Sequence, residues 1–131
     1  MGIVRAQVDI KNPRLPDAPF RAVNMLVDSG SHHLCIPESL REELDLEIAE
    51  HKAVVLADGR AVRAPYAGPI QLRFKNRIGY AGALVMGDEP LLGVIPMEDM
   101  DLVVLPKEER LDVNPEHPDI AGALAKGGGG I

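Results

Sequence analysis

The sequence of 131 residues is poor in cysteine and in aromatic residues. Its single cysteine, Cys35, excludes an intramolecular disulfide and fits a reducing compartment, so we expect a cytoplasmic protein. Tryptophan is absent, and aromatic residues make up only 3% of the chain. The core must therefore be built from Val, Leu, Ile, Met and Ala, and a hydrophobic content of 46% is sufficient for one packed domain.

Basic clusters and long apolar runs are also missing. The net charge is -6, and no dense group of Lys and Arg is present to neutralise phosphates, which argues against binding to nucleic acid or to an anionic membrane. No window approaches the roughly 18 apolar residues of a membrane-spanning helix. The first residues also lack the apolar core of a signal peptide. We therefore expect a soluble protein.

Proline and glycine, by contrast, are frequent, with 11 and 13 copies spread along the chain. This punctuation predicts many turns between short strands, and so a closed or sandwiched antiparallel β domain. We expect the strands at residues 3–10, 20–27, 53–57, 60–66, 70–74, 78–86, 91–94, 102–105 and 110–113. Val4, Ala6, Val8 and Ile10 alternate with polar residues, as in a half-buried strand. Residues 20–27 are mostly apolar, as in a strand covered on both faces.

Two helices, a hairpin and a tail complete the predicted organisation. Leu40, Leu44 and Ile48 recur at intervals of four, which predicts a helix of about three turns that begins at Pro37. A second, short helix is expected at residues 96–101. The domain should span residues 1–113, followed by a flexible tail at 114–131 that is polar, rich in proline and ends near four glycines.

The Asp58-Gly59 pair lies between two of the predicted strands. A two-residue Asp-Gly link favours a β-hairpin with a type I′ turn, in which both residues have positive φ.

One stretch points to chemistry: Met-Leu-Val-Asp-Ser-Gly-Ser at residues 25–31. An apolar strand there ends in Asp28 at the mouth of a tight turn. A lone buried charge costs several kcal/mol, so this carboxylate needs either a satisfied structural role or a chemical one. The structural alternative is an Asp that caps its own turn through an Asx-type hydrogen bond.

With Leu-Cys-Ile-Pro following the Asp-Ser-Gly-Ser loop and Leu-Leu-Gly at 91–93, the chain resembles the retropepsin-like aspartic proteases, particularly the small prokaryotic ones. The resemblance runs from the first strand to about Val113. It implies an all-β, retropepsin-like acid-protease barrel with one or two short helices, active as a twofold homodimer.

The resemblance also implies a role for each matching residue. Asp28 would be catalytic, with Ser29, Gly30 and Ser31 completing the active-site loop and the Ser29 hydroxyl bonding across the dimer interface. The hairpin at Asp58 and Gly59 would form a flap over the substrate. The strand that carries Leu91, Leu92 and Gly93 would support the active-site loop. Ser31 is either a donor to Asp28 or a solvated turn serine.

The chemistry of Asp28 agrees with these roles. Two carboxylates that share one proton supply both the base that activates water and the acid that protonates the carbonyl oxygen. One chain carries one Asp-Ser-Gly, so the second must come from another copy, and we expect a homodimer that hydrolyses peptide bonds without a cofactor. The alternative is a catalytically silent, dimeric peptide-binding or scaffold module of the same fold.

His32, His33 and Cys35 follow the loop closely enough to raise the question of a metal. A structural zinc site usually takes four ligands at regular spacing, and the sequence has neither Cys-x-x-Cys nor His-x-x-x-His. We expect no metal. The two histidines should line the substrate groove or face solvent, and Cys35 should be a small apolar residue near the catalytic loop.

Overall fold

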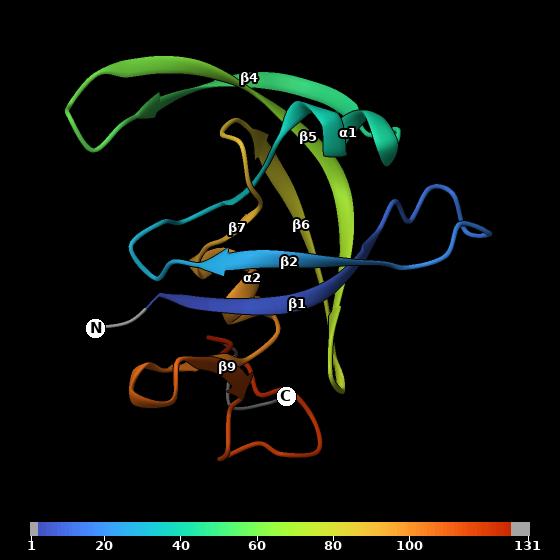
Figure 1. Cartoon of the computed structure of the whole chain (residues 1–131). Coiled ribbons are helices and arrows are strands. Elements are labelled where there is room, and N and C mark those ends of the chain that lie inside the picture. The colour runs from blue at the N-terminus through green and yellow to red at the C-terminus, as the bar shows by residue number, and fades with distance from the viewer. Residues whose placement is uncertain (1–2, 127–131) are drawn as a thin grey trace.

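The computed structural model describes residues 3–126, and seven of its strands form one sheet in the order β1-β2-β7-β3-β6-β5-β4, while β8 and β9 pair as a separate sheet (Figure 1). β1 (Val4–Lys11) pairs with both β2 (Arg21–Val27) and β5 (Ala61–Phe74), so the sheet closes on itself as a barrel, with β4 added outside the ring. The predicted all-β barrel with one or two short helices is confirmed. The other elements are β3 (Leu34–Ile36), α1 (Glu38–Glu43), β4 (Glu47–Val55), β6 (Arg77–Val85), β7 (Leu91–Leu92), α2 (Val94–Asp99), β8 (Leu102–Leu105), a 3₁₀ turn (Pro106–Glu108) and β9 (Arg110–Val113).

The core fills the inside of this barrel with aliphatic and methionine side chains. In β1 the alternation predicted from the sequence is confirmed, because Val4, Val8 and Ile10 are buried. In β2 the prediction is wrong in part: Met25 and Val27 are buried, but the first residues of the strand are exposed. Val23 packs against the core from a partly buried position, whereas Arg21, Ala22 and Asn24 are exposed, so only Met25 and Val27 are fully part of the core.

The predicted three-turn helix is also wrong. α1 ends at Glu43, Asp45 has a left-handed φ of 53°, and Ile48 lies 44% exposed in β4. Only Leu40 and Leu44 of the expected stripe are buried. Pairing of β4 with β5 satisfies more backbone groups than one further helical turn would, so tertiary pairing overrides the local period.

A second difference concerns β5, which is one strand of 14 residues where two separate strands were expected. Its register against β6 shifts between Ala67 and Ile70, around the cis Gly68–Pro69 bond. Such a bulge bends a strand without ending it, so Pro69 is accommodated inside the element.

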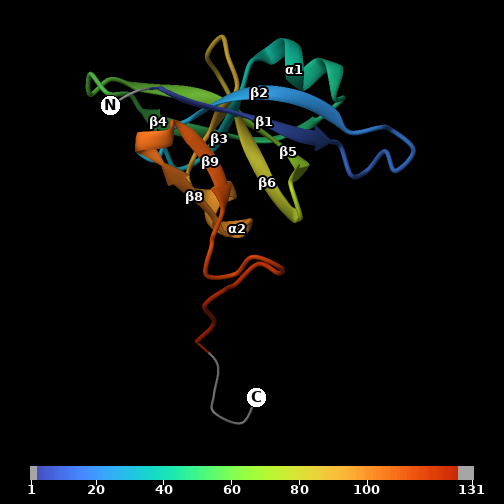
Figure 2. The same cartoon turned by 60° about the horizontal axis from the view of Figure 1, so that its bottom comes forward.

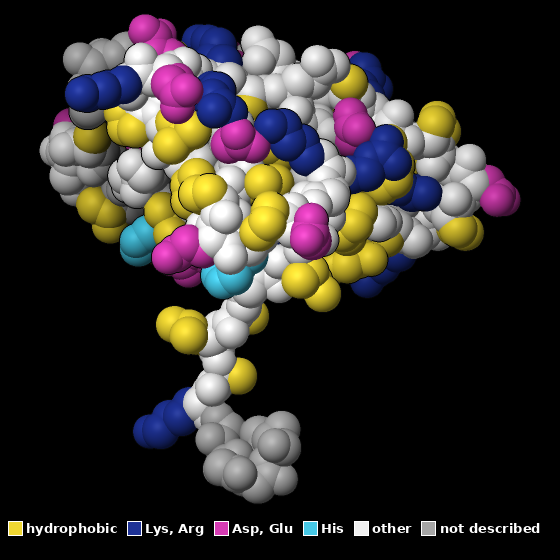
Figure 3. Space-filling model, turned by 90° about the horizontal axis from the view of Figure 1, so that it is seen from below, with side chains coloured by type: hydrophobic (Ala, Val, Ile, Leu, Met, Phe, Trp, Pro, Cys, Tyr) yellow, Lys and Arg dark blue, Asp and Glu magenta, His cyan; other side chains and the backbone are white. Residues whose placement is uncertain are grey.

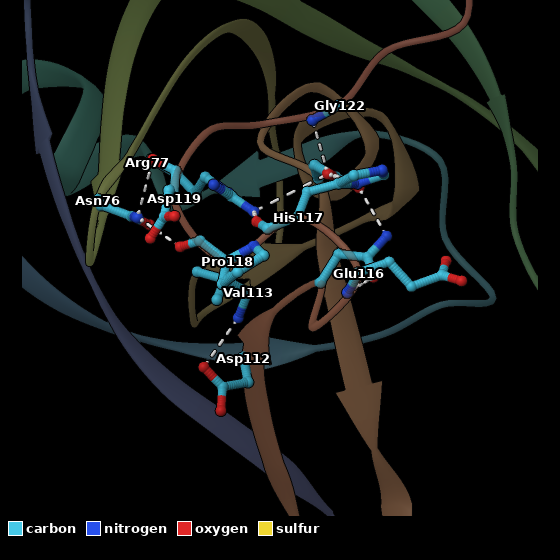
Figure 4. Close-up of polar contacts among 11 residues, drawn as sticks. Asn76, Arg77, Asp112, Val113, Glu116, His117, Pro118, Asp119 and Gly122 are labelled. Atoms are coloured by element: carbon cyan, nitrogen blue, oxygen red, sulfur yellow. Dashed lines mark hydrogen bonds and ion pairs between the residues drawn. The ribbon is translucent and has the colours of Figure 1, made fainter.

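After β9 the chain runs past the end of α2 and away from the sheet (Figure 2). The Asp101 carboxylate holds this segment: it accepts hydrogen bonds from Asn114 Nδ2 (3.1 Å) and Gly122 N (2.8 Å) and lies 2.7 Å from His117 Nδ1. These contacts lower the pKa of Asp101 to about 2, chiefly through the Gly122 amide. The buried Arg77 donates to the carbonyl oxygen of His117 (Figure 4).

The mobility expected of residues 114–131 stays a prediction, and residues 127–131 lie outside the described residues. On the face seen from below, apolar side chains are interleaved with charged ones, and the last described residues project from the body (Figure 3). Within residues 3–126, no helix is long and apolar enough to cross a lipid bilayer.

Candidate functional site

The loop after β2 places Asp28 at the end of a core strand. The Asp28 main-chain carbonyl accepts a hydrogen bond from Ser31 N (3.2 Å), and its carboxylate Oδ1 accepts one from Gly30 N (2.9 Å). The Asx-type contact considered for a purely structural Asp is therefore present. It uses one oxygen only, so it orients the carboxylate without excluding a chemical role.

Hydrogen bonds on both sides fix this loop in place. Asp28 N donates to Leu92 O (3.0 Å), which extends the parallel pairing of β2 with β7. Val94 N, in the first turn of α2, donates to Ser31 O (2.8 Å). Residues 91–94 thus bracket the loop from β7 and from the start of α2.

Gly93 lies directly against the same loop. A Cβ atom there would come within 2.4 Å of His33 O and 2.7 Å of Ser31 O, closer than real Cβ atoms approach. Its φ of -94° and ψ of -171° are accessible to any residue. Glycine is needed at this position because the start of α2 touches the backbone of residues 31–33. The backbone conformation of Gly93 would by itself allow any residue.

The β4–β5 hairpin faces the loop, and its tip corrects a sequence prediction. Gly59 N donates to Leu56 O (2.9 Å), and Leu56 N donates to Arg60 O (2.8 Å), so the loop has three residues: Ala57, Asp58 and Gly59. Only Gly59 of these has a positive φ, at 87°. The predicted two-residue type I′ turn is wrong, because this is a type I turn followed by a left-handed glycine. An Asp-Gly pair fits both loops.

A groove of about 610 Å³ lies between the Asp28 loop and the β4–β5 hairpin, which lie on the same side of the molecule (Figure 1). The structure brings several of the predicted residues together here and adds hairpin residues. The lining residues are Asp28, Gly30, Ser31, His32, His33, Cys35, residues 52–57, Leu84, Met86 and Leu91. Asp58 and Gly59 lie at the hairpin tip outside this lining, and Leu92 is fully buried beneath it.

A second, smaller hollow of about 270 Å³ lies on the other side of the loop. Asp28 belongs to both hollows, whereas Ser29 lines only this one. The remaining lining residues are Ile3, Val4, Leu26, Val27, Val104 and Pro106, all of them apolar. The Asp28 loop therefore borders a groove that mixes ionisable and apolar side chains on one face, and on the other a hollow that is apolar apart from Asp28 and Ser29.

Three residues near the groove escaped sequence reasoning. Lys52 Nζ lies 4.6 Å from the centroid of the Tyr66 ring. The ring of His33 meets the same ring edge-on at 6.0 Å. A Cβ on Gly82 would lie 2.3 Å from Tyr66 Cζ, so glycine there makes room for the ring. Only the register of β4, β5 and β6 brings these residues together, so no local pattern along the chain pointed to them.

Burial sets the protonation of two groups in the groove. It lowers the pKa of His33, and the Lys52 ammonium lowers it further, so His33 is predominantly neutral at neutral pH. Burial, reinforced by the Asp28 charge, raises the pKa of the Cys35 thiol, which stays protonated. Among residues 3–126, no three His, Cys, Asp or Glu side chains converge in a way that suits a metal ion.

No family model and no curated protein matches the sequence. Solved structures do match the fold. The EIAV protease complexed with the inhibitor HBY-793 is 18% identical with a TM-score of 0.56, over 75% of this chain and 88% of that one. The retroviral protease-like domain of Ddi1 from Leishmania major is 11% identical with a TM-score of 0.54, over 87% of this chain and 91% of that one. The fold is therefore retropepsin-like, and the resemblance expected from the sequence is confirmed at the level of the fold.

Proposed function

We propose that this chain, with its retropepsin-like fold, is an aspartic endopeptidase whose active site forms between two copies. The observation that carries the proposal is the position of Asp28, held at the base of an open groove of about 610 Å³ beneath a β-hairpin. A peptide lying in that groove would pass between the carboxylate and the hairpin.

The reaction needs a base and an acid at one place. Two Asp28 carboxylates about 3 Å apart cannot both ionise, so they share one proton. The ionised carboxylate takes a proton from water, and the water oxygen bonds to the carbonyl carbon of the substrate. The protonated carboxyl gives its proton to the carbonyl oxygen. Collapse of the tetrahedral intermediate then breaks the C–N bond as the amine nitrogen is protonated, with no covalent enzyme intermediate and no cofactor.

The apolar hollow beside Ser29 supports the dimer. It opens next to Asp28, and neighbouring Ile3 is 66% exposed. A twofold contact here would bury apolar surface and bring the two Asp28 loops together. The same contact would place each exposed Ser29 hydroxyl near the partner's loop.

The direct test is turnover of a diverse peptide library, with products identified by mass spectrometry. We expect internal cleavage at a limited set of sites. Peptide binding without any cleavage would instead favour a silent, dimeric peptide-binding module. The library also reveals the cleavage preference.

Specific activity should fall on dilution. The site is complete only in the dimer, so below the dimer dissociation constant the active fraction drops with concentration. Sedimentation velocity and initial rates over the same dilution series measure both quantities. Undiminished specific activity in a monomer would exclude a shared site.

The variant Gly59→Val tests the hairpin as a flap. A β-branched residue at a φ of 87° costs about 1–2 kcal/mol, and we expect kcat/KM to fall by roughly tenfold or more because the tip no longer closes correctly. Steady-state kinetics and thermal melts separate catalysis from folding.

Gly87→Val is the matched control. Gly87 also has a positive φ, of 81°, with no atom within 4 Å of its added Cβ, but it lies in the turn before β7. Its replacement should cost similar stability and leave turnover per folded protein nearly unchanged. Equal kinetic losses in both variants would mean that Gly59 acts through stability alone.

A further inference from the structure

We infer that Lys52 makes the groove selective for peptides with an acidic side chain, an inference that rests on the proposed function. Lys52 lies on β4 and is the one Lys or Arg among the described residues that line the groove. The other ionisable groups there are Asp28, His32, His33 and Cys35. Apart from the proposed catalytic acid, the groove therefore presents no anionic side chain to a substrate.

The Lys52 ammonium is held in a defined place. It lies over the face of Tyr66, which in turn is packed against Gly82 and the His33 ring. A cation over an aromatic face gains about 0.5–1 kcal/mol at exposed sites, which limits how far the flexible side chain swings. The Lys52 ammonium group is therefore held at the wall of the groove and does not move freely through the solvent.

Among residues 3–126, one acidic side chain forms an ion pair with Lys52. Glu50 Oε2 lies 3.4 Å from Lys52 Nζ, and the two side chains are 59% and 36% exposed. An ion pair this open contributes little, so a substrate carboxylate that enters the partly enclosed groove can replace it. Glu50 does not itself line the groove.

Overall charge does not explain such a preference. The chain has 20 acidic and 14 basic residues, so its average field repels acidic peptides. A preference for them must come from a local positive group. Burial and the Lys52 charge lower the pKa of His33, so that ring is predominantly neutral at neutral pH, and Lys52 is the one Lys or Arg among the described lining residues.

The proposed twofold symmetry doubles this feature. Each copy contributes one Lys52, one on either side of the scissile bond. We therefore expect acidic residues to be enriched at two substrate positions, equally far from the cleaved bond on its two sides.

The first experiment is cleavage of a proteome-derived peptide library by the full chain. We expect enrichment of Asp and Glu at the two symmetric positions. Two fluorescent peptides that differ only by Glu or Gln at those positions then serve as probes. Wild-type kcat/KM should favour the Glu peptide by about threefold to tenfold, and the ratio should shrink as NaCl rises from about 0.05 M to about 0.5 M.

Four variants locate the effect. Lys52→Gln should bring the ratio close to one, Lys52→Glu should bring it below one in favour of the Gln peptide, and Glu50→Gln should increase it by removing the competitor. Lys126→Gln removes the same charge at an exposed site in the C-terminal segment and should leave the ratio unchanged. Thermal melts confirm that each variant is folded.

Binding to the Asp28→Asn protein separates this inference from the proposed function. If nothing is cleaved but the Glu peptide still binds that protein more tightly than the Gln peptide, and Lys52→Gln abolishes the difference, the Lys52 inference stands while the protease proposal fails. If cleavage occurs with no Glu preference, or with one that survives in Lys52→Gln, the Lys52 inference is wrong and the protease proposal stands. Failure of both peptides to be bound or cleaved overturns both.

Discussion

Replacing Asp28 by Asn should reduce peptide hydrolysis by about 10⁴-fold or to the background rate, while the fold and the dimer remain. Asn keeps the shape of the side chain, and its Oδ1 still accepts the bond from Gly30 N that closes the turn. It cannot share or transfer the proton that the reaction needs. The measurement is kcat/KM on a cleaved library peptide, with circular dichroism and sedimentation for the fold and the dimer.

The control for this variant is Asp17→Asn, which makes the same change in an exposed acid of the β1–β2 loop, outside the groove lining. It should hydrolyse peptides at the wild-type rate. Near wild-type turnover by Asp28→Asn would remove Asp28 from the catalytic site. Unfolding of that variant would instead show that the carboxylate is needed for the turn itself, against the expectation stated above.

Replacing Gly93 by Ala should produce the second largest loss. The added methyl group would meet His33 O at 2.4 Å, and neither atom can rotate away, because the Cβ position is fixed by the Gly93 backbone and His33 O is itself a backbone atom. The start of α2 and the Asp28 loop must therefore separate. A displacement of about 1 Å at a catalytic group costs on the order of 10²-fold in rate, and overpacking costs about 1–3 kcal/mol of stability.

Gly79→Ala separates these two losses. Its added Cβ would also be crowded, at 2.7 Å from Met100 Cγ, but the neighbour is a flexible side chain away from the loop. We expect lower thermal stability with nearly normal kcat per folded molecule. If Gly93→Ala shows the same pattern, with stability lost and kcat retained, the contact between Gly93 and the loop supports folding only.

Local patterns predicted much of the architecture, because strand alternation and turn residues act over a few positions. The burial of Val8 and Ile10 in β1 follows from period-two alternation, and β8 and β9 lie where the apolar runs around Pro106 place them. The same locality explains the errors. Leu40, Leu44 and Ile48 match a helical period, but pairing with β5 takes Ile48 into a strand. The Asp-Gly pair is compatible with two turn types, and strand register chooses between them.

The residues of the candidate site also fall into two groups: those that the sequence identified and those that only the structure placed there. The sequence alone was enough to single out Asp28, because an acid at the end of an apolar run is costly unless something uses it. It was also enough to predict an all-β chain with a hairpin at Asp58 and Gly59. These features depend on covalent neighbours, so they can be read along the chain.

Only the tertiary structure decided what surrounds Asp28. Gly93 meets His33 across some 60 positions of sequence, and Lys52, Tyr66 and Gly82 come together through the register of three different strands. Such contacts depend on how the barrel closes, which is a balance of packing and backbone pairing over the whole chain. A one-residue slip in β4 or β5 would turn Lys52 out of the groove, which is why no local pattern could place it there.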